Sequence, residues 1–268
     1  MELMLNMILK NNMDEFILPI DNEKFRKTNY PWNQLMLNDP WSVGYVSMLI
    51  ELKVFTKKEE WEEFYFEMGE YRLKKMNGLS NEIIELLEDE QLIRNDKAKV
   101  YKLAKEIIDI NKLNGRTETQ LRKKGKILYE FIKNKQTDIT EEECFQAVKY
   151  RVIGETWNGI ILREHNTIKV LTQKFPKANF VKKEGEFDFN YAVDYEIYFN
   201  GQLICGIQIK PKSYTYNTPY ILKARRANLA KNTKYYEEFN APVFDVISTA
   251  RGNINNIYVL DKITSLLK

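Results

Sequence analysis

Three polar residues stand close together in the second half of the chain, on two runs that are rich in β-branched and aromatic residues. Asp194 lies in the run YAVDYEIYF, and Gln208 and Lys210 lie in the run QLICGIQIK. Carboxylate and amide oxygens can coordinate a hard cation such as Mg²⁺, and the lysine adds a positive charge beside them. These residue types could form a cation-binding site if the fold brings them together.

A β-hairpin is the element that would have to position them. The two runs are separated by Asn200-Gly201, which is the strongest short-range signal for a hairpin. Because side chains alternate between the two faces of a strand, the register decides whether Asp194 shares a face with the polar pair of the second run. A strict two-residue turn would pair Asp194 with Ile207 and place the acid on the opposite face.

A three-residue turn gives a different register. The loop would comprise Phe199 to Gly201, with Asn200 right-handed and Gly201 left-handed as a G1 bulge. Asp194 would then pair with Gly206, and all three polar side chains would share one face. We predict this bulged hairpin, and we expect Gly206, which has no side chain, to leave room for a metal or a phosphate beside the acid.

A helix is predicted over about Glu155 to Lys174, where apolar residues fall on one face at helical spacing. This face comprises Trp157, Ile160, Ile161, Ile168 and Leu171. Glu164 lies in the middle of the apolar face, where a carboxylate is costly unless it has a partner. Two partners are open: Asp194 through a shared cation, or a basic residue in a buried ion pair. Glu155 lies nine residues earlier and, at about 100° per residue, points the other way on a continuous helix, so we prefer Glu164.

An acid, a short interval and a polar-x-Lys pair on the next strand, with a helical glutamate upstream, resemble the PD-(D/E)xK nuclease core. Longer segments are similar to the MjaI-type family of restriction endonucleases, over roughly residues 150 to 220. These segments are GETWNGIILREHNTIKVL, YAVDYEIYFNG and GIQIKPKSY. The resemblance implies a type II restriction enzyme that cleaves double-stranded DNA at a short specific site with Mg²⁺ as its cofactor.

The resemblance also implies roles for the four candidate catalytic residues. Asp194 would be the metal-binding acid, and Lys210 the motif lysine that stabilises the attacking water and the developing negative charge. Gln208 departs from the pattern, because its amide oxygen can coordinate magnesium but brings no charge. Glu164 is the candidate for the missing charge and for a third metal ligand. The pattern leaves open whether one or two ions act.

All the charged side chains around and after the motif lysine are basic, because no Asp or Glu occurs from Gln208 to Tyr236. Two prolines, Pro211 and Pro219, bracket a loop that leads into a helix predicted from about Ile221. Such a loop and basic helix would suit the phosphates of a DNA groove. The candidate DNA-binding residues are Lys212, Tyr214, Lys223, Arg225, Arg226 and Lys231. The alternative is a solvated helix face without a partner.

The expected fold is α+β, or α/β. A mostly helical region over residues 1–138 would serve DNA contacts or dimerisation, and residues 139–268 would form a PD-(D/E)xK-like core with a central mixed β-sheet flanked by helices. The capping-box pair Thr140 and Glu143 predicts a helix start just after this boundary. A buried strand is predicted over Pro242 to Thr249, and a short edge strand over Tyr258 to Leu260. His165, the single histidine, is expected at the surface.

Composition narrows the class of protein. The 268 residues are 44% apolar, enough for a sizeable core, and 41 basic against 38 acidic side chains give a net charge of only +3. Two cysteines, Cys144 and Cys205, cannot form a disulfide framework, which fits a reducing cytoplasm. We find no signal-peptide pattern, no membrane-spanning run, and no GxxxxGK[ST] or GxGxxG loop in the sequence, so we expect a soluble enzyme that is not secreted and does not use ATP.

Two other functions remain open at this level. A repair or recombination nuclease could share the same fold, because fold does not determine the substrate. A non-catalytic DNA-binding protein could use the basic loop and helix while Gln208 marks a decayed site. If the protein is a restriction enzyme with a palindromic site, cutting both strands calls for a two-fold homodimer.

Overall fold

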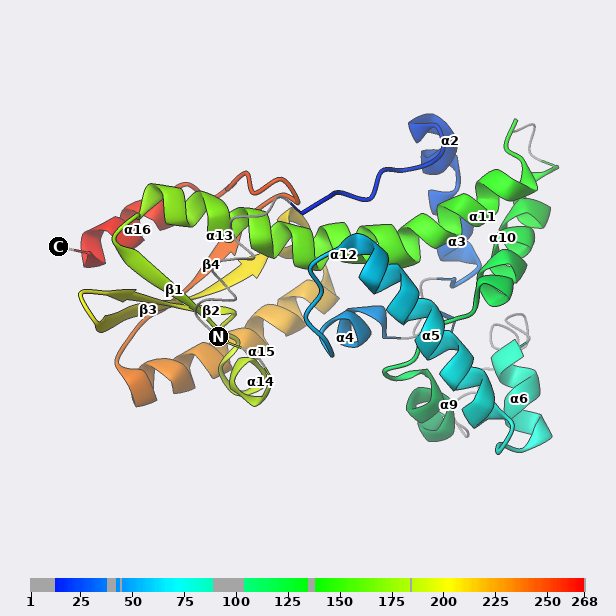
Figure 1. The fold of residues 1–268 in the computed structure, drawn as a ribbon, viewed down its shortest axis with the longest axis horizontal. Coiled ribbons are helices and arrows are strands. Elements are labelled where there is room, and N and C mark those ends of the chain that lie inside the picture. Colours follow the sequence, from blue (N-terminus) through cyan, green and yellow to red (C-terminus); the bar gives the residue numbers. More distant parts are fainter. Residues whose placement is uncertain are drawn as a thin grey trace. The chain divides into compact units, whose positions relative to one another are not determined.

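The computed structural model describes residues 13–37, 42–43, 45–88, 104–134, 138–183 and 185–267. They belong to two compact units, which meet in sequence between Asn158 and Gly159. The first unit, Met13–Asn158, is helical in its described part, and the second, Gly159–Lys268, carries the β-sheet (Figure 1). The change of pattern expected near residue 138 corresponds to the start of a helix within the first unit.

The first unit confirms the predicted helical composition for the part of it that the structure describes. Its helices are α2(Asn22–Lys27), α3(Asn29–Gln34), α4(Val46–Ile50), α5(Lys58–Met76), α6(Asn81–Glu88), α9(Ala104–Asn111), α10(Glu118–Ile132), α11(Glu141–Lys149), the π-helical η1(Tyr150–Gly154) and α12(Glu155–Trp157). Trp61 and Tyr65 of α5 are fully buried in this unit, and the indole of Trp61 donates to the carbonyl of Ile153 over 3.1 Å. Full burial of one large apolar side chain contributes roughly 1.5–3 kcal/mol relative to leaving it exposed.

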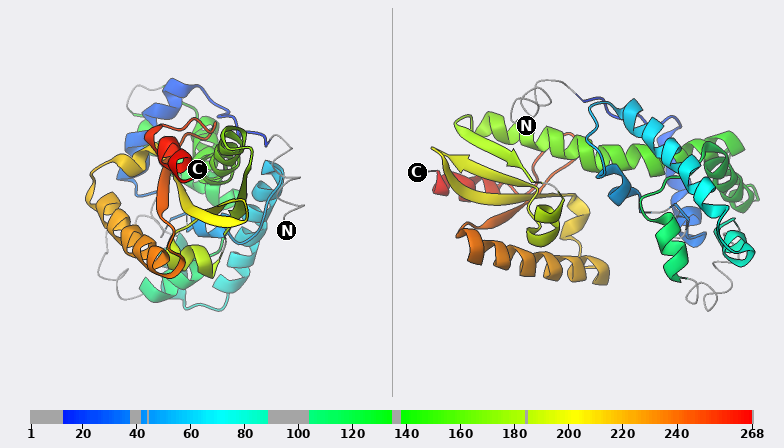
Figure 2. Two further views of the ribbon diagram at one scale, coloured as in Figure 1. Left: turned by 90° about the vertical axis from the view of Figure 1, so that its left-hand side faces the viewer. Right: turned by 60° about the horizontal axis from the view of Figure 1, so that its bottom comes forward.

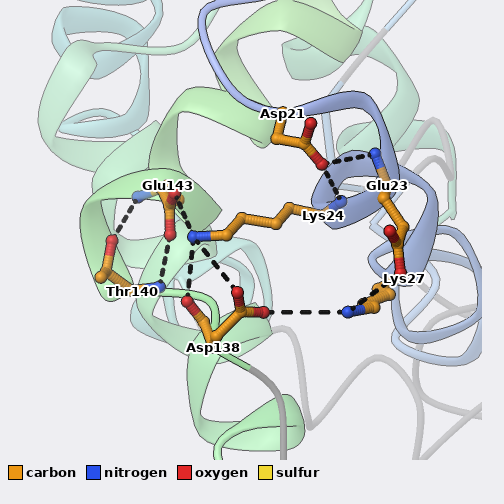
Figure 3. A network of polar contacts seen from close by, with 7 residues as sticks. All are labelled: Asp21, Glu23, Lys24, Lys27, Asp138, Thr140 and Glu143. Atoms are coloured by element: carbon orange, nitrogen blue, oxygen red, sulfur yellow. Dashed lines mark hydrogen bonds and ion pairs between the residues drawn. The ribbon is translucent and has the colours of Figure 1, made fainter.

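The start of α11 confirms the predicted capping box. The Thr140 hydroxyl accepts from the Glu143 N–H at 3.1 Å, and the Glu143 carboxylate accepts from the Thr140 N–H at 2.8 Å. Lys24 of α2 reaches the same place: its ammonium lies 2.8 Å from the Glu143 carboxylate and donates to the Asp138 carbonyl at 3.1 Å (Figure 3). The cap therefore also ties α2 to the segment that begins α11.

The second unit is a four-stranded mixed sheet between helices, as predicted. Its elements are the π-helical η2(Asn158–Leu162), α13(Arg163–Lys174), β1(Ala178–Lys182), α14(Glu186–Tyr191), β2(Tyr195–Phe199), β3(Gln202–Lys210), the 3-10 helix η3(Lys212–Thr215), α15(Pro219–Phe239), β4(Val243–Ile247) and α16(Tyr258–Leu266). The strand order is β1-β2-β3-β4, with the first three antiparallel and β4 parallel to β3. A parallel neighbour needs a crossover, which α15 supplies.

Helices cover both faces of this sheet (Figures 1 and 2). On one face, Ile207 of β3 packs in a core with Ile168 of α13 and Ile263 of α16. On the other face, Tyr235 of α15 packs with Val193 and neighbouring aromatic rings of α14 and α15. The alternation of side chains along β3 thus sends its isoleucines to one core and leaves the residues between them facing α15.

The predicted three-residue hairpin loop is wrong. Asn200 and Gly201 both have positive φ, 51° and 79°, which a type I′ two-residue turn requires, so Asn200 is not right-handed. The register shift arises further along, where Ile204 of β3 is an extra residue opposite the Ile197/Tyr198 step of β2. A primed turn matches the twist of the strands, and the bulge then shifts the pairing by one residue.

Gly206 lies opposite Glu196 and not opposite Asp194, and it leaves no space for a ligand. A Cβ atom at Gly206 would lie 3.0 Å from Cγ2 of Val193 and 3.3 Å from Cγ2 of Val243. The expected room for a metal or phosphate is therefore occupied by packed valines. The absence of a side chain at Gly206 allows β3 to pack closely against Val193 and Val243.

Substituting this glycine provides a test of the packing. We expect Gly206→Ala to lower the free energy of unfolding by about 1–3 kcal/mol, because the added methyl group overpacks the site. Gly159→Ala is the matched control, since a Cβ there would meet its nearest neighbour, the Arg163 guanidinium, at an ordinary 3.7 Å. Urea unfolding of both variants measures the difference, and equal midpoints would contradict the packing role.

Three further predictions in this unit have clear outcomes. The strand predicted over Pro242 to Thr249 is confirmed as β4, but Tyr258 to Leu260 begins α16 and is not a strand, because Val259 and Ile263 are buried at helical spacing. His165 is buried, at 5% exposure, and not at the surface, because it lies three residues before the core residue Ile168 on the same helix.

The helix predicted over residues 155–174 contains a π-helical segment. The π-helical η2 lies between Glu155 and Glu164. The rotation of about 100° per residue holds for an α-helix, so it does not give the angle between these two side chains. Glu155 belongs to the first unit and Glu164 to the second. Glu164 is therefore the glutamate in the same unit as the candidate strands.

Candidate active site

Asp194 reaches the polar pair of β3 through the main chain. It precedes the first residue of β2, and its Oδ2 accepts a 2.6 Å hydrogen bond from the N–H of Ile209. Its own N–H donates to the carbonyl of Ile207 at 2.9 Å. Ile209 is the residue between Gln208 and Lys210, so the carboxylate of Asp194 lies against the centre of the Gln-x-Lys segment.

The Asp194 carboxyl group holds its proton more tightly than an ordinary aspartate. Burial raises its pKa to about 7, and the negative charges of Glu164 and Asp188 act in the same direction. The positive charge of Lys210 and the hydrogen bond from Ile209 lower the pKa but do not offset the burial. A carboxylate in this state gains strongly from a nearby cation, which would favour its ionised form.

Gln208 is buried, with 3% of its surface exposed, and faces α15. Its Oε1 accepts a 3.1 Å hydrogen bond from Nδ2 of Asn228, which also contacts the Tyr214 hydroxyl at 3.0 Å. An amide oxygen has two lone pairs, so one remains for a further ligand. Asn228 therefore fixes the orientation of the side chain at the motif position that lacks an acid.

Lys210, at the end of β3, lies among several carboxyl groups. Its charge lowers the pKa values of Asp188, Asp194 and Asp245, each of which burial raises. Its ammonium also lies 5.8 Å from the centre of the Tyr214 ring. Lys210 is half-buried. Because it is the last residue of β3, its positive charge lies at the end of the sheet near these acids.

Glu164 forms an ion pair with a basic residue, which is one of the two partners that the sequence left open. Its Oε1 lies 3.0 Å from the ammonium of Lys182 on β1 and accepts a 2.8 Å hydrogen bond from the Tyr195 hydroxyl. Its charge also acts on Asp194 by raising the pKa of that group. Within the described ranges of the chain, no group of three His, Cys, Asp or Glu side chains is arranged to hold a metal ion.

Three residues near the site were not singled out from the sequence. Asp188 is on α14, Asn228 is on α15, and Asp245 is on β4 directly opposite Gln208. An aspartate inside the apolar run PVFDVIST is the one available signal, because a buried strand seldom carries an unpaired acid. Its significance depends on which strand lies next to it, and that cannot be read locally.

The candidate DNA-binding residues divide into two groups. Lys212, Lys223 and Arg226 are exposed, and Lys231 is half-buried with its ammonium 4.6 Å from the centre of the Phe189 ring. The fold places them on η3 and α15 of the sheet unit.

Tyr214 and Arg225 have structural contacts. Tyr214 is buried at 8% exposure. The Arg225 guanidinium donates to the carbonyls of Tyr214 at 2.9 Å and Tyr216 at 2.5 Å, and to Oδ1 of Asn217 at 3.3 Å. These bonds brace the loop between β3 and α15.

The model of the MjaI restriction endonuclease family matches residues 28–255. The chain belongs to the MjaI restriction endonuclease family. The match covers most of both units and includes every candidate site residue, whereas the resemblance read from the sequence covered roughly residues 150 to 220. No curated protein and no solved structure matches the chain. Membership of the MjaI restriction endonuclease family implies nuclease activity on DNA. Among the described residues, no helix is long and apolar enough to cross a membrane.

Proposed function

We propose that the protein is a type II restriction endonuclease that hydrolyses phosphodiester bonds in double-stranded DNA at a specific site, with Mg²⁺ as cofactor. The observation that carries this proposal is the hydrogen bond from the Ile209 N–H to the Asp194 carboxylate. It brings the acid of a PD-(D/E)xK-like motif against Gln208 and Lys210. Family membership supports the restriction endonuclease class.

The donor set fits magnesium. Asp194 offers carboxylate oxygen and Gln208 offers amide oxygen, which are the hard ligands that Mg²⁺ prefers. Burial raises the pKa of Asp194, so a bound cation would stabilise its ionised form. Bound magnesium would polarise the scissile phosphate and lower the pKa of a water molecule.

The protein residues would divide the remaining tasks. Asp194 and Gln208 would bind the cation, with Asn228 holding the Gln208 amide in place. Lys210 would stabilise the negative charge that develops on the phosphate. Glu164, anchored by Lys182 and Tyr195, would add negative charge to the cation site from α13.

DNA would be bound through the basic residues that follow the motif. Lys212, Lys223 and Arg226 are exposed and therefore available to phosphates. Lys231 lies on α15 together with Lys223 and Arg226. Tyr214 and Arg225 would contribute by shaping the loop from which Lys212 projects. A palindromic site would be cut by a two-fold homodimer.

The direct test is digestion of a long, methylation-free duplex DNA by the native protein, with Mg²⁺ and with EDTA. We expect discrete fragments with Mg²⁺ and none with EDTA. Cutting that follows DNA structure and not sequence would instead indicate a repair or recombination nuclease. Binding that is indifferent to magnesium, with no product, would indicate a non-catalytic DNA-binding protein.

The proposed DNA surface makes a prediction about salt. Each phosphate contact makes the slope of log K against log salt more negative by about 0.9, so Arg226→Ala should weaken DNA binding and reduce the magnitude of that slope by about 0.9. Lys174→Ala is the control, since Lys174 is exposed at the end of α13, the helix that covers the other face of the sheet. Fluorescence anisotropy at several salt concentrations, in Ca²⁺ to prevent cleavage, measures both. Equal slopes for the two variants would contradict the assigned surface.

A further inference from the structure

The pairing of β3 with β4 places an acid beside the motif position that has lost one. In this parallel pair Gln208 lies opposite Asp245, and Gly206 lies opposite Val243. Residues directly opposite one another in a sheet have side chains on the same face. The valine confirms this, since its Cγ2 lies 3.3 Å from the place where a Gly206 Cβ would be. Asp245 and Gln208 therefore project from the same face of adjacent strands.

The surroundings of the Asp245 carboxyl group resemble those of Asp194. Burial raises its pKa, and the positive charges of Lys210 and Arg225 lower it. Its Oδ1 is buried, and within the described part of the chain that oxygen has no hydrogen-bond partner. Leaving such an acceptor unsatisfied is costly, and more so when it is charged. A ligand that accepts electron pairs from oxygen would remove this cost.

The side chain of Asn256 holds the main chain around Asp245 in position. The Nδ2 of Asn256 donates to the Asp245 carbonyl at 2.8 Å, and the Oδ1 of Asn256 accepts from the Ile247 N–H at 2.8 Å. These two bonds fix the end of β4 independently of the Asp245 side chain. The carboxylate is thus carried on a rigid strand and is not itself needed to complete the sheet.

Glu164 differs from Asp245 in this respect. Its Oε1 already has the Lys182 ammonium at 3.0 Å and the Tyr195 hydroxyl at 2.8 Å. A carboxylate so paired contributes less net negative charge to a cation site. Asp245 has the better position for compensating the neutral amide, because it is the direct neighbour of Gln208.

We propose that Asp245 supplies the carboxylate that Gln208 lacks, and that it binds the cation of this site together with Gln208. The proposal rests on the proposed function, since it assigns a further ligand to the same site. The motif acid has in effect moved from β3 to the adjacent position on β4. The cation site then combines the charges of Asp194 and Asp245 with the neutral amide between their strands.

The test measures Mn²⁺ binding to the full chain without DNA, from the EPR signal of the free ion. We expect Asp245→Asn to weaken binding about ten- to a hundredfold, the range seen when groups that support a metal site are removed. Asp261→Asn is the matched control, because Asp261 is exposed on α16 of the same unit. Circular dichroism and thermal melting of each variant establish that it is folded.

A double variant separates charge from structure. Adding Gln208→Glu to Asp245→Asn returns a carboxylate to the motif position, and we expect it to restore at least tenfold of the lost Mn²⁺ affinity. Weakening without restoration would show that Asp245 acts by positioning Lys210 or the strand, and would overturn the proposal. Unchanged affinity in Asp245→Asn would also overturn it.

The same experiment distinguishes this proposal from the proposed function. If Asp194→Asn loses Mn²⁺ and Asp245→Asn keeps it, the cation site stands and only the assignment of Asp245 fails. If the native protein binds no Mn²⁺, both fail together.

Discussion

Asp194→Asn is expected to reduce DNA cleavage at least about a thousandfold, while the variant remains folded and still binds DNA. The asparagine can keep the hydrogen bond from Ile209 through its amide oxygen, but it lacks the charge that binds the cation. Loss of one preorganised electrostatic group in an active site costs about a hundred- to a thousandfold in rate, and loss of a metal ligand costs more. Single-turnover cleavage of duplex DNA in Mg²⁺ measures the effect.

The same substitution should make the protein more stable at high pH. The folded pKa of Asp194 is about 7 against an ordinary value of 3.8, so between these values the folded state holds a proton that the unfolded state has released. The free energy of unfolding therefore falls as pH rises across this window, and the full cost of the buried charge is present above about pH 7. Asparagine does not titrate, so its advantage over aspartate should grow from pH 4 to pH 7.

Urea unfolding in EDTA, at pH 4, 5.5, 7 and 8, checks this trend. Asp261→Asn is again the control and should follow the native protein at every pH, because Asp261 is exposed. If Asp194→Asn cut DNA normally, Asp194 would be excluded from the active site. If Asp194→Asn were less stable than the native protein at pH 8, the burial of the Asp194 carboxylate would not be costly.

Lys210→Met is expected to reduce cleavage about a hundred- to a thousandfold and to change DNA affinity by less than about tenfold. Methionine keeps the length of the side chain but removes the charge that would stabilise the phosphate during reaction. Because the Lys210 charge lowers the pKa of Asp194, the variant should also need a higher pH for its remaining activity. Cleavage rates across pH, compared with affinities measured in Ca²⁺, separate these effects.

Lys212→Met provides the comparison for this experiment. Lys212 lies two residues further along and is exposed at the start of η3, where we assign it to phosphate binding. We expect this variant to bind DNA more weakly while it cleaves bound DNA at a nearly native rate. If the two lysines showed the opposite division of effects, the assignment of Lys210 to the reaction and Lys212 to binding would be reversed.

Local sequence patterns determined where several elements of this protein begin and end. The Asn200-Gly201 pair marked the hairpin, and the Thr140 and Glu143 pair marked the start of α11. Pro211 and Pro219 marked the loop before α15, although this helix begins at Pro219 and not at about Ile221. Each of these signals depends on the backbone preferences of a few neighbouring residues, so it can be read without knowing the rest of the fold. The family could also be recognised from three short segments of the second half.

Tertiary structure decided how these elements fit together. The hairpin register depends on the bulge at Ile204, and the sequence alone allows several turns that differ by one residue. His165 is buried because it lies one turn before the core residue Ile168 on α13, and only the packed structure shows how much of that helix faces the core. Such errors arise where the competing arrangements have similar local energies and distant contacts choose between them.

The candidate site follows the same division. The sequence determined which residues could do chemistry, because Asp194, Gln208 and Lys210 are recognisable by type and spacing. Only the folded chain decided that the acid meets its partners through the main chain of Ile209, and that β4 lies next to β3. The second fact brings Asp245 beside Gln208, and it could not be read from the sequence because a parallel pairing joins segments separated by an entire helix.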